Sequence, residues 1–181
     1  MRIVSGTLGG RRLRAPAGDA TRPTSERVRE SIFSILGPPD DETDVLDLFA
    51  GSGAMGLEAL SRGARHVTFI DSGKHALAAL RENLDVLGVS GRAKVIAGDA
   101  LSILKRPAQR YRWCFIDPPY RSDLATQALP LLDPSLTEDA VVVVEHDRRN
   151  DPGDAHGSLI RTDSRRYGDT VIAFYRRREP T

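Results

Sequence analysis

A run of apolar residues at positions 45–49 ends in a glycine-rich turn at 51–56, and a helical pattern begins within that turn. The apolar positions of this helix are Ala54, Leu57, Leu60 and Ala64, which recur at the spacing of one helix face. Glycines allow a backbone to approach a bound nucleotide closely, and the free N–H groups of a helix N-terminus attract an anion. The stretch therefore predicts a strand, a nucleotide-binding turn and a helix.

The alternation of apolar strand patterns and amphipathic helix patterns continues along the chain. Strands are expected at residues 44–49, 66–70, 94–97, 112–116 and 140–145, and helices at 54–62, 74–87, 101–105 and 124–132. This order is typical of a doubly wound, mostly parallel sheet with helices on both faces. Two further strands, at 159–160 and 171–175, predict a C-terminal antiparallel hairpin that completes a seven-stranded α/β sheet.

The first 37 residues do not follow this alternation, so we expect residues 1–37 to form a small extension and residues 38–181 to form the α/β domain. Residues 2–14 predict a β-hairpin that turns at Gly9 and Gly10. A helix follows, for which either Thr24 or Ser25 is a good N-cap. Its expected apolar stripe consists of Val28, Ile32, Ile35 and Leu36.

The chain has a net charge of only +1, but its charges are unevenly distributed. Residues 1–36 contain seven arginines and three acidic residues, and the whole chain contains 23 arginines and 3 lysines. Arginine binds phosphate in a bidentate fork and stacks on bases, so the extension is a candidate RNA-binding surface. The candidate substrate-binding residues are Arg11, Arg12, Arg14, Arg22, Thr24, Arg27 and Arg29. An arginine-rich codon preference with an ordinary solvated surface is the alternative explanation.

Composition excludes several classes of protein. The single cysteine, Cys114, excludes an internal disulfide and fits a reducing compartment, and its apolar surroundings predict a core residue and not a nucleophile. Because no apolar run reaches the ~20 residues of a membrane helix and no signal peptide is visible, we expect a soluble, cytoplasmic chain without a membrane partner. The four histidines lack the spacing of metal ligands, so no metal is expected.

The glycine turn fits two cofactors. Gly51, Gly53 and Gly56 match the dinucleotide fingerprint, and Asp71 lies where a ribose-binding acid is expected, so a nicotinamide dehydrogenase is a rival interpretation. However, an acid at Asp47 is unfavourable beside a pyrophosphate and favourable beside the ammonium and sulfonium groups of S-adenosylmethionine. The candidate cofactor-binding residues are Asp47, Phe49, Ala50, Gly51, Gly53, Asp71, Ser72, Asp99 and Ala100. Asp71 and Asp99 are also placed where each could simply cap a helix.

Residues Asp117, Pro118, Pro119 and Tyr120 directly follow an expected strand and are the candidate catalytic residues. The lone pair of an exocyclic amine is delocalised into its ring, so methyl transfer requires an acceptor that holds the amine in line with the methyl group. Asp117 supplies that acceptor, the prolines stiffen the backbone, and Tyr120 offers a face on which a flipped-out base stacks. The motif predicts a methyltransferase acting on an amino group.

The chain resembles the RsmD family along nearly its whole length, in residues 2–6, 10–13, 21–30, 45–64 and 117–120. The resemblance implies a class I S-adenosylmethionine-dependent methyltransferase of Rossmann-like fold that modifies the exocyclic N2 of one guanine in 16S rRNA. It also implies that the substrate is an assembled or assembling small ribosomal subunit, and we expect a monomer. Relatives often have Glu in place of Asp71, which puts the contact with the ribose in doubt.

Two other functions remain open from the sequence. The tetrapeptide at 117–120 also serves adenine-N6 methylation, so a DNA methyltransferase is one alternative. A catalytically silent RNA-binding assembly factor is the other, and it predicts that the protein does not bind S-adenosylmethionine.

Overall fold

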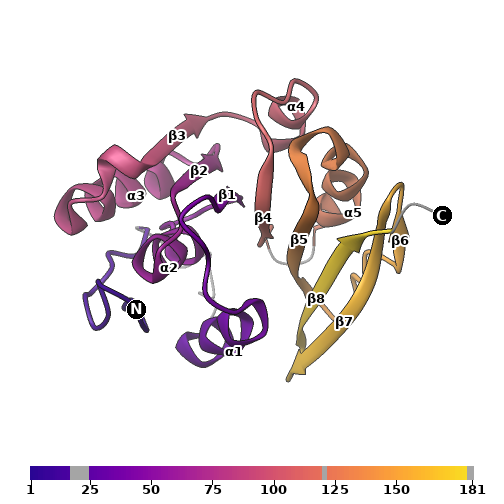
Figure 1. The fold of residues 1–181 in the computed structure, drawn as a ribbon, viewed down its shortest axis with the longest axis horizontal. Helices are drawn as coiled ribbons and strands as arrows, with labels where there is room; N and C mark the ends of the chain where they lie inside the picture. Colours follow the sequence, from indigo (N-terminus) through magenta and orange to yellow (C-terminus); the bar gives the residue numbers. More distant parts are fainter. Residues whose placement is uncertain (17–24, 120–121, 179–181) are drawn as a thin grey trace.

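The computed structural model describes residues 1–16, 25–119 and 122–178, and in these residues it contains one eight-stranded sheet (Figure 1). The strands are β1 (Asp44–Leu48), β2 (His66–Asp71), β3 (Ala93–Ala97), β4 (Tyr111–Ile116), β5 (Leu136–Asp147), β6 (Ala155–His156), β7 (Leu159–Tyr167) and β8 (Thr170–Arg177). The α-helices are α1 (Glu26–Leu36), α2 (Ala54–Arg62), α3 (Lys74–Leu87), α4 (Ala100–Leu104) and α5 (Leu124–Ala128), and short 3₁₀ helices span Ser90–Arg92, Leu129–Leu131 and Asp133–Ser135.

The order of the strands is β3-β2-β1-β4-β5-β8-β7-β6. The first five of these are parallel, whereas β8 is antiparallel to both β5 and β7. The predicted α/β fold with its antiparallel C-terminal hairpin is therefore confirmed. The predicted number of seven strands is wrong, because the two residues of β6 pair with Leu159 and Ile160 and add an eighth strand. Such a short, polar strand leaves no hydrophobic pattern in the sequence.

Helices cover both faces of the sheet, and each face has its own hydrophobic core. On one face, apolar residues of α1, α2 and α3 pack on alternate sheet residues such as Val45 and Phe115. On the other face, α4 and α5 pack on Leu46, Cys114 and their neighbours. The alternation follows from the two-residue period of a strand. Each parallel strand therefore ends at the same rim of the sheet, with its side chains fixed from both sides.

Helix α1 begins where the sequence predicts, since the side chain of Ser25 accepts a hydrogen bond from the backbone N–H of Val28 at 3.2 Å. Its buried stripe differs from the predicted one. Ile35 is 40% exposed, and Phe33 occupies the core in its place. The Phe33 ring packs edge-on against Trp113, with ring centroids 6.1 Å apart. The aromatic cluster on the sheet decides which side of α1 faces inward.

The N-terminal segment forms a short hairpin, as predicted, but with a longer turn and only one bridge, between Arg2 and Arg12. Ile3 donates a backbone hydrogen bond to the carbonyl of Arg11, and Leu13 donates one to the carbonyl of Met1. Ile3 and Leu13 are buried in the same core as α1 and α2. The hairpin is thus held by the α/β domain and not by its own ladder.

A buried carboxylate fixes this hairpin to α2. Glu58 is fully buried and accepts hydrogen bonds from the backbone N–H groups of Val4 at 2.7 Å and Ser5 at 3.0 Å. It also accepts one from Nε of Arg62 at 2.8 Å. One turn further along α2, the carbonyl of Ser61 accepts the N–H of Thr7 at 2.8 Å. Three donors therefore converge on the two carboxyl oxygens of Glu58.

We expect the substitution Glu58→Gln to lower the free energy of unfolding by about 1–2 kcal/mol, because the amide offers one acceptor oxygen where the carboxylate offers two. Urea unfolding at neutral pH measures this change. The matched control is Glu138→Gln, whose side chain is 82% exposed in its ion pair with Arg177 and should change stability by less than about 0.5 kcal/mol. Equal stabilities for the two variants would contradict the role given to Glu58.

Candidate functional site

A cavity of about 360 Å³ opens at the rim where the parallel strands end. Eleven of its lining residues are ones that the sequence singles out: Asp47, Phe49, Ala50, Gly51, Asp71, Ser72, Asp99, Ala100, Asp117, Pro118 and Pro119. They come from four different strand ends, so the fold brings together residues that are far apart in the sequence. All of the cofactor candidates except Gly53 therefore share one cavity with the described catalytic candidates.

The turn after β1 has a constrained backbone. Phe49 adopts φ 58°, the left-handed region that a non-glycine residue rarely occupies, and Gly51 follows with φ 56°. The N–H of Gly51 donates to Oδ2 of Asp71 at 2.8 Å. The N–H of Gly73 donates to Oδ1 of the same carboxylate at 2.7 Å. Asp71 thus ties the glycine turn to the start of α3, and strain of this kind is typical of functional turns.

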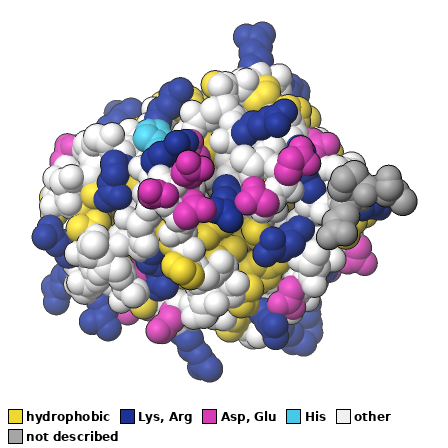
Figure 2. Space-filling model, in the orientation of Figure 1, with side chains coloured by type: hydrophobic (Ala, Val, Ile, Leu, Met, Phe, Trp, Pro, Cys, Tyr) yellow, Lys and Arg dark blue, Asp and Glu magenta, His cyan; other side chains and the backbone are white. Residues whose placement is uncertain are grey.

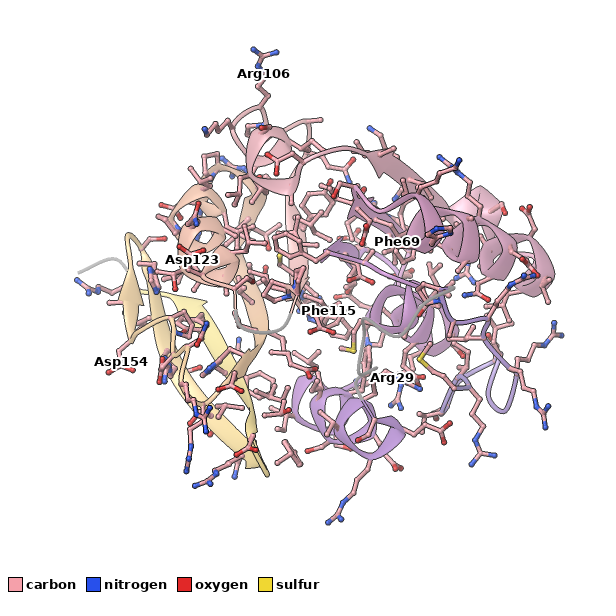
Figure 3. The ribbon with its side chains drawn as sticks, turned by 180° about the vertical axis from the view of Figure 1, so that it is seen from behind. Arg29, Phe69, Arg106, Phe115, Asp123 and Asp154 are labelled. Carbon is pink, nitrogen blue, oxygen red and sulfur yellow. The ribbon has the colours of Figure 1, made fainter. Side chains whose placement is uncertain are left out.

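Asp47 lies inside β1, one residue before its end, and is only 2% exposed. Its neighbours in the sheet are Phe69 and Phe115, which Figure 3 shows in the middle of the molecule. Its carboxyl group accepts a hydrogen bond from the backbone N–H of Gly56 at 2.9 Å. Burial, with a smaller contribution from the negative charge of Asp71, raises the pKa of Asp47 to about 8. A cation bound beside this group would favour its ionised form.

Asp99 caps α4, as the alternative interpretation of that residue proposed. Its carboxylate accepts the backbone N–H of Ser102 at 2.8 Å, and hydrogen bonds from Ser102 hold the pKa of Asp99 below its usual range. Asp99 nevertheless also lines the cavity. Capping and ligand binding are compatible because each carboxylate oxygen has two acceptor positions.

Asp117 directly follows β4 and lines the cavity with Pro118 and Pro119. The carbonyl of Pro119 accepts the N–H of Ser122 at 3.2 Å. The carbonyl of Ser122 in turn accepts Nδ2 of Asn150 at 3.3 Å. The segment after β4 is therefore braced against the loop that follows β5. Tyr120, the fourth predicted catalytic residue, lies outside the described residues.

Two predicted residues have other positions. Gly53 does not line the cavity but begins α2 at φ 82°, where an added Cβ would lie 2.4 Å from Cδ1 of Leu80. Arg29, predicted to bind RNA, is fully buried and donates a hydrogen bond from its guanidinium to the carbonyl of Arg2. The prediction for Arg29 is wrong, because its helix turns this side chain toward the body of the protein (Figure 3).

The other predicted RNA-binding residues are exposed where the structure describes them. These are Arg11, Arg12, Arg14 and Arg27, while Arg22 and Thr24 lie outside the described residues. Arg14 forms an exposed ion pair with Glu82 at 2.6 Å. An exposed pair of this kind contributes little to stability, so the guanidinium can exchange this carboxylate for a phosphate.

Several residues around the cavity have no recognisable motif in the sequence. These residues are Met1, Ala15, Pro16, His146, Asn150 and Thr170, all of which line the cavity. Asn83, on α3, donates a hydrogen bond to the carbonyl of Ser52 in the glycine turn. Its position on the apolar stripe of α3 was a usable signal, because a polar residue there requires buried partners.

The charge of the cavity restricts its ligand. Its described lining contains six acidic residues, Asp47, Asp71, Asp99, Asp117, Glu145 and Asp147, and neither lysine nor arginine. On the face shown in Figure 2, acidic side chains gather near the middle, whereas lysines and arginines are spread around them. A pyrophosphate would be repelled here, but a positively charged ligand without phosphate would be attracted. The residues present therefore fit S-adenosylmethionine and disfavour a nicotinamide dinucleotide.

The described residues contain no cluster of three or more His, Cys, Asp or Glu side chains that could hold a metal ion. In the same part of the chain, every helix is too short or too polar to cross a membrane.

Comparison with known proteins identifies the family. A family model described as "Conserved hypothetical protein 95" matches residues 1–176. The Bacillus subtilis (strain 168) protein YlbH, provisionally named an rRNA methyltransferase, is 42% identical over 183 residues that cover 98% of this chain and 100% of YlbH. Ribosomal RNA small subunit methyltransferase D of Escherichia coli (strain K12) is 38% identical over 152 residues, covering 83% of this chain and 76% of that protein.

Comparison with solved structures supports the same family. The solved structure of yhhF from Escherichia coli superimposes with a TM-score of 0.87 at 34% identity, covering 99% of both chains. The family model spans more than half of this chain, and the relatives align over most of it. With a methyltransferase fold and an acidic cavity at its strand ends, this chain belongs to the Conserved hypothetical protein 95 family, which is the RsmD family.

Proposed function

We propose that this protein is a cytoplasmic, monomeric rRNA methyltransferase that transfers a methyl group from S-adenosylmethionine to the exocyclic N2 of a specific guanine in 16S rRNA. The observation that supports it best is that Asp117, Pro118 and Pro119 line the same cavity as Asp47 and Asp71. The names of the relatives support rRNA as the substrate. The small ribosomal subunit, or an intermediate of its assembly, is the proposed partner.

The roles of the cofactor-binding residues follow from charge and position. When bound, S-adenosylmethionine supplies an electrophilic methyl group on a positively charged sulfur. Asp47 lies beside the glycine turn and lines the cavity, so its ionised form would balance the positive charge at the methionine end of the cofactor. Asp71 accepts one hydrogen bond from the glycine turn and would offer its remaining acceptor positions to the ribose hydroxyls, and Asp99, which caps α4, would accept a hydrogen bond from the adenine amine. Phe49, Ala50 and their neighbours supply the apolar walls.

Asp117 is the proposed acceptor for the substrate amine. By accepting an N–H hydrogen bond it localises the nitrogen lone pair and stabilises the positive charge that develops on N2. After the N–C bond has formed and the S–C bond has broken, the amine releases one proton, which Asp117 can accept. Pro118 and Pro119 fix the backbone that carries this carboxylate, so little reorganisation accompanies the reaction.

A direct test is to compare 16S rRNA from cells with and without the gene for this protein. We expect one N2-methylguanine to be missing from the small-subunit RNA of the deletion strain, and purified protein to restore it. Methylation of adenine-N6 in DNA, with rRNA unmodified, would favour the DNA methyltransferase. Absence of any S-adenosylmethionine binding in calorimetry would favour the catalytically silent assembly factor.

The exposed arginines of the hairpin provide a test of the RNA surface. Replacing Arg11, Arg12 and Arg14 with alanine removes three proposed phosphate contacts and should make the plot of log K against log salt shallower by about two. Filter binding to a 16S rRNA transcript at several salt concentrations measures this slope.

The matched control removes three exposed cations from the opposite rim of the sheet, Lys105, Arg106 and Arg110. Figure 3 shows Arg106 projecting away from the body of the protein. This triple variant should keep the slope of the wild type. If both triple variants change the slope equally, RNA binding depends on overall charge and the hairpin is not its site.

A further inference from the structure

A buried amide lies between the N-terminal extension and the glycine turn. Asn83 is 3% exposed, on the side of α3 that also buries Leu80 and Leu84. Its Oδ1 accepts the backbone N–H of Arg14 at 2.7 Å, and its Nδ2 donates to the carbonyl of the same residue at 3.0 Å. The second N–H of the amide donates to the carbonyl of Ser52 at 3.0 Å. Both donors of Asn83 are therefore in use, one toward each partner.

The two partners of Asn83 belong to different parts of the proposed machinery. Ser52 lies in the glycine turn and lines the cavity. Arg14 is one of the exposed arginines of the proposed RNA surface, and the next two residues, Ala15 and Pro16, line the same cavity. One side chain thus connects the cofactor turn with the segment that carries the RNA-binding arginines.

The remaining contacts of the extension strengthen this connection. Its hydrogen bonds to α2 go to Glu58 and Ser61, and α2 begins directly after the glycine turn. Gly6 approaches α2 so closely that an added Cβ would lie 2.0 Å from the carbonyl oxygen of Ser61. The extension is therefore fixed to α2 and, through Asn83, to α3. Asn83 also donates a hydrogen bond to the glycine turn itself.

We infer that Asn83 is a positioning residue that holds the cofactor turn against the N-terminal extension, and that the binding of cofactor and the binding of RNA are coupled through it. A ligand that orders the turn reduces the freedom of Arg14, and RNA that holds Arg14 reduces the freedom of the turn. Such a coupling is reciprocal, and each ligand should tighten the binding of the other by at least about fivefold. The inference rests on the proposed function.

The coupling can be measured with S-adenosylhomocysteine, which binds as the product without turnover, and a 16S rRNA transcript. For the wild type we expect the dissociation constant of S-adenosylhomocysteine to fall at least about fivefold when RNA is saturating, and the reverse titration to give the same ratio. In the variant Asn83→Ala the ratio should fall to about one. The matched control is Glu82→Gln on the same helix, which removes only the exposed ion pair of Arg14 and should keep the wild-type ratio.

Hydrogen exchange on the wild type tests the same inference without a substitution. Adding RNA alone should protect the amides of residues 51–53, and adding S-adenosylhomocysteine alone should protect those of residues 11–14. If Asn83→Ala does not fold, this measurement on the wild type still tests the coupling. If the wild type binds both ligands but the ratio of dissociation constants is one and neither ligand protects the site of the other, the inference is overturned and the proposed function is not. A wild type that binds neither ligand would instead contradict the proposed function.

Discussion

Replacing Asp117 with alanine is expected to lower kcat for methyl transfer by about 10²–10³-fold, while the dissociation constant for S-adenosylmethionine changes by less than about threefold. The carboxylate follows β4 and lines the cavity, and in the proposed mechanism it stabilises charge only while the methyl group is being transferred. Single-turnover kinetics with small subunits and calorimetry with the cofactor measure the two quantities separately.

The matched control for Asp117 is Asp123→Ala. Asp123 is an exposed acid that directly precedes α5, and Figure 3 labels it beside that helix. Its replacement should leave kcat within about twofold of the wild type. Asp117→Asn keeps one acceptor oxygen and should retain more activity than the alanine variant. Near-normal turnover in Asp117→Ala would remove the central residue of the proposed mechanism.

The buried carboxyl group of Asp47 predicts an unusual dependence of stability on pH. Because its pKa in the folded protein is raised from 3.8 to about 8, the folded state keeps a proton that the unfolded chain has lost over that interval. The stabilising contribution of protonated Asp47 is complete below about pH 4 and is lost as pH rises through about 8. Over this window the free energy of unfolding should fall by on the order of a few kcal/mol.

The substitution Asp47→Asn isolates this effect, since asparagine does not titrate and still offers an oxygen to the N–H of Gly56. Urea unfolding from pH 4.5 to pH 9 should show the variant gaining stability relative to the wild type until about pH 8 and remaining level above it. The wild type should also bind S-adenosylmethionine more tightly as pH rises to about 8, and the variant should not. A constant difference between the two proteins at every pH would show that Asp47 is ionised throughout.

The α/β core could be predicted because its signals are local. Helix α2 has the predicted bounds, since Gly53 and Gly63 adopt φ values of 82° and 117° that end the helix pattern on both sides. Strands β2 and β4, which end at Asp71 and just before Asp117, are each predicted by a short apolar run followed by an acid. For these elements, periodicity and glycine positions are sufficient.

The errors concern contacts between segments that are distant in sequence. Arg29 lies on the polar side of its helix, for which the sequence predicts exposure to solvent. It is buried because the hairpin docks there and brings the carbonyl of Arg2 beside its guanidinium. Asn83 acquires its role from Arg14, 69 positions earlier in the chain. Local sequence patterns do not contain such pairings. They therefore predict the acids of the site but not the contact between the glycine turn and the N-terminal extension.

The position of β8 determines when during translation the protein can become competent. Along the described chain it is the last strand to be synthesised, yet it lies between β5 and β7 in the sheet. Until it emerges from the ribosome, the apolar strand β5 has an open edge. Its first residue, Thr170, also completes the wall of the cavity. A nascent chain therefore cannot close this edge of the sheet or the cavity wall until β8 has left the ribosome.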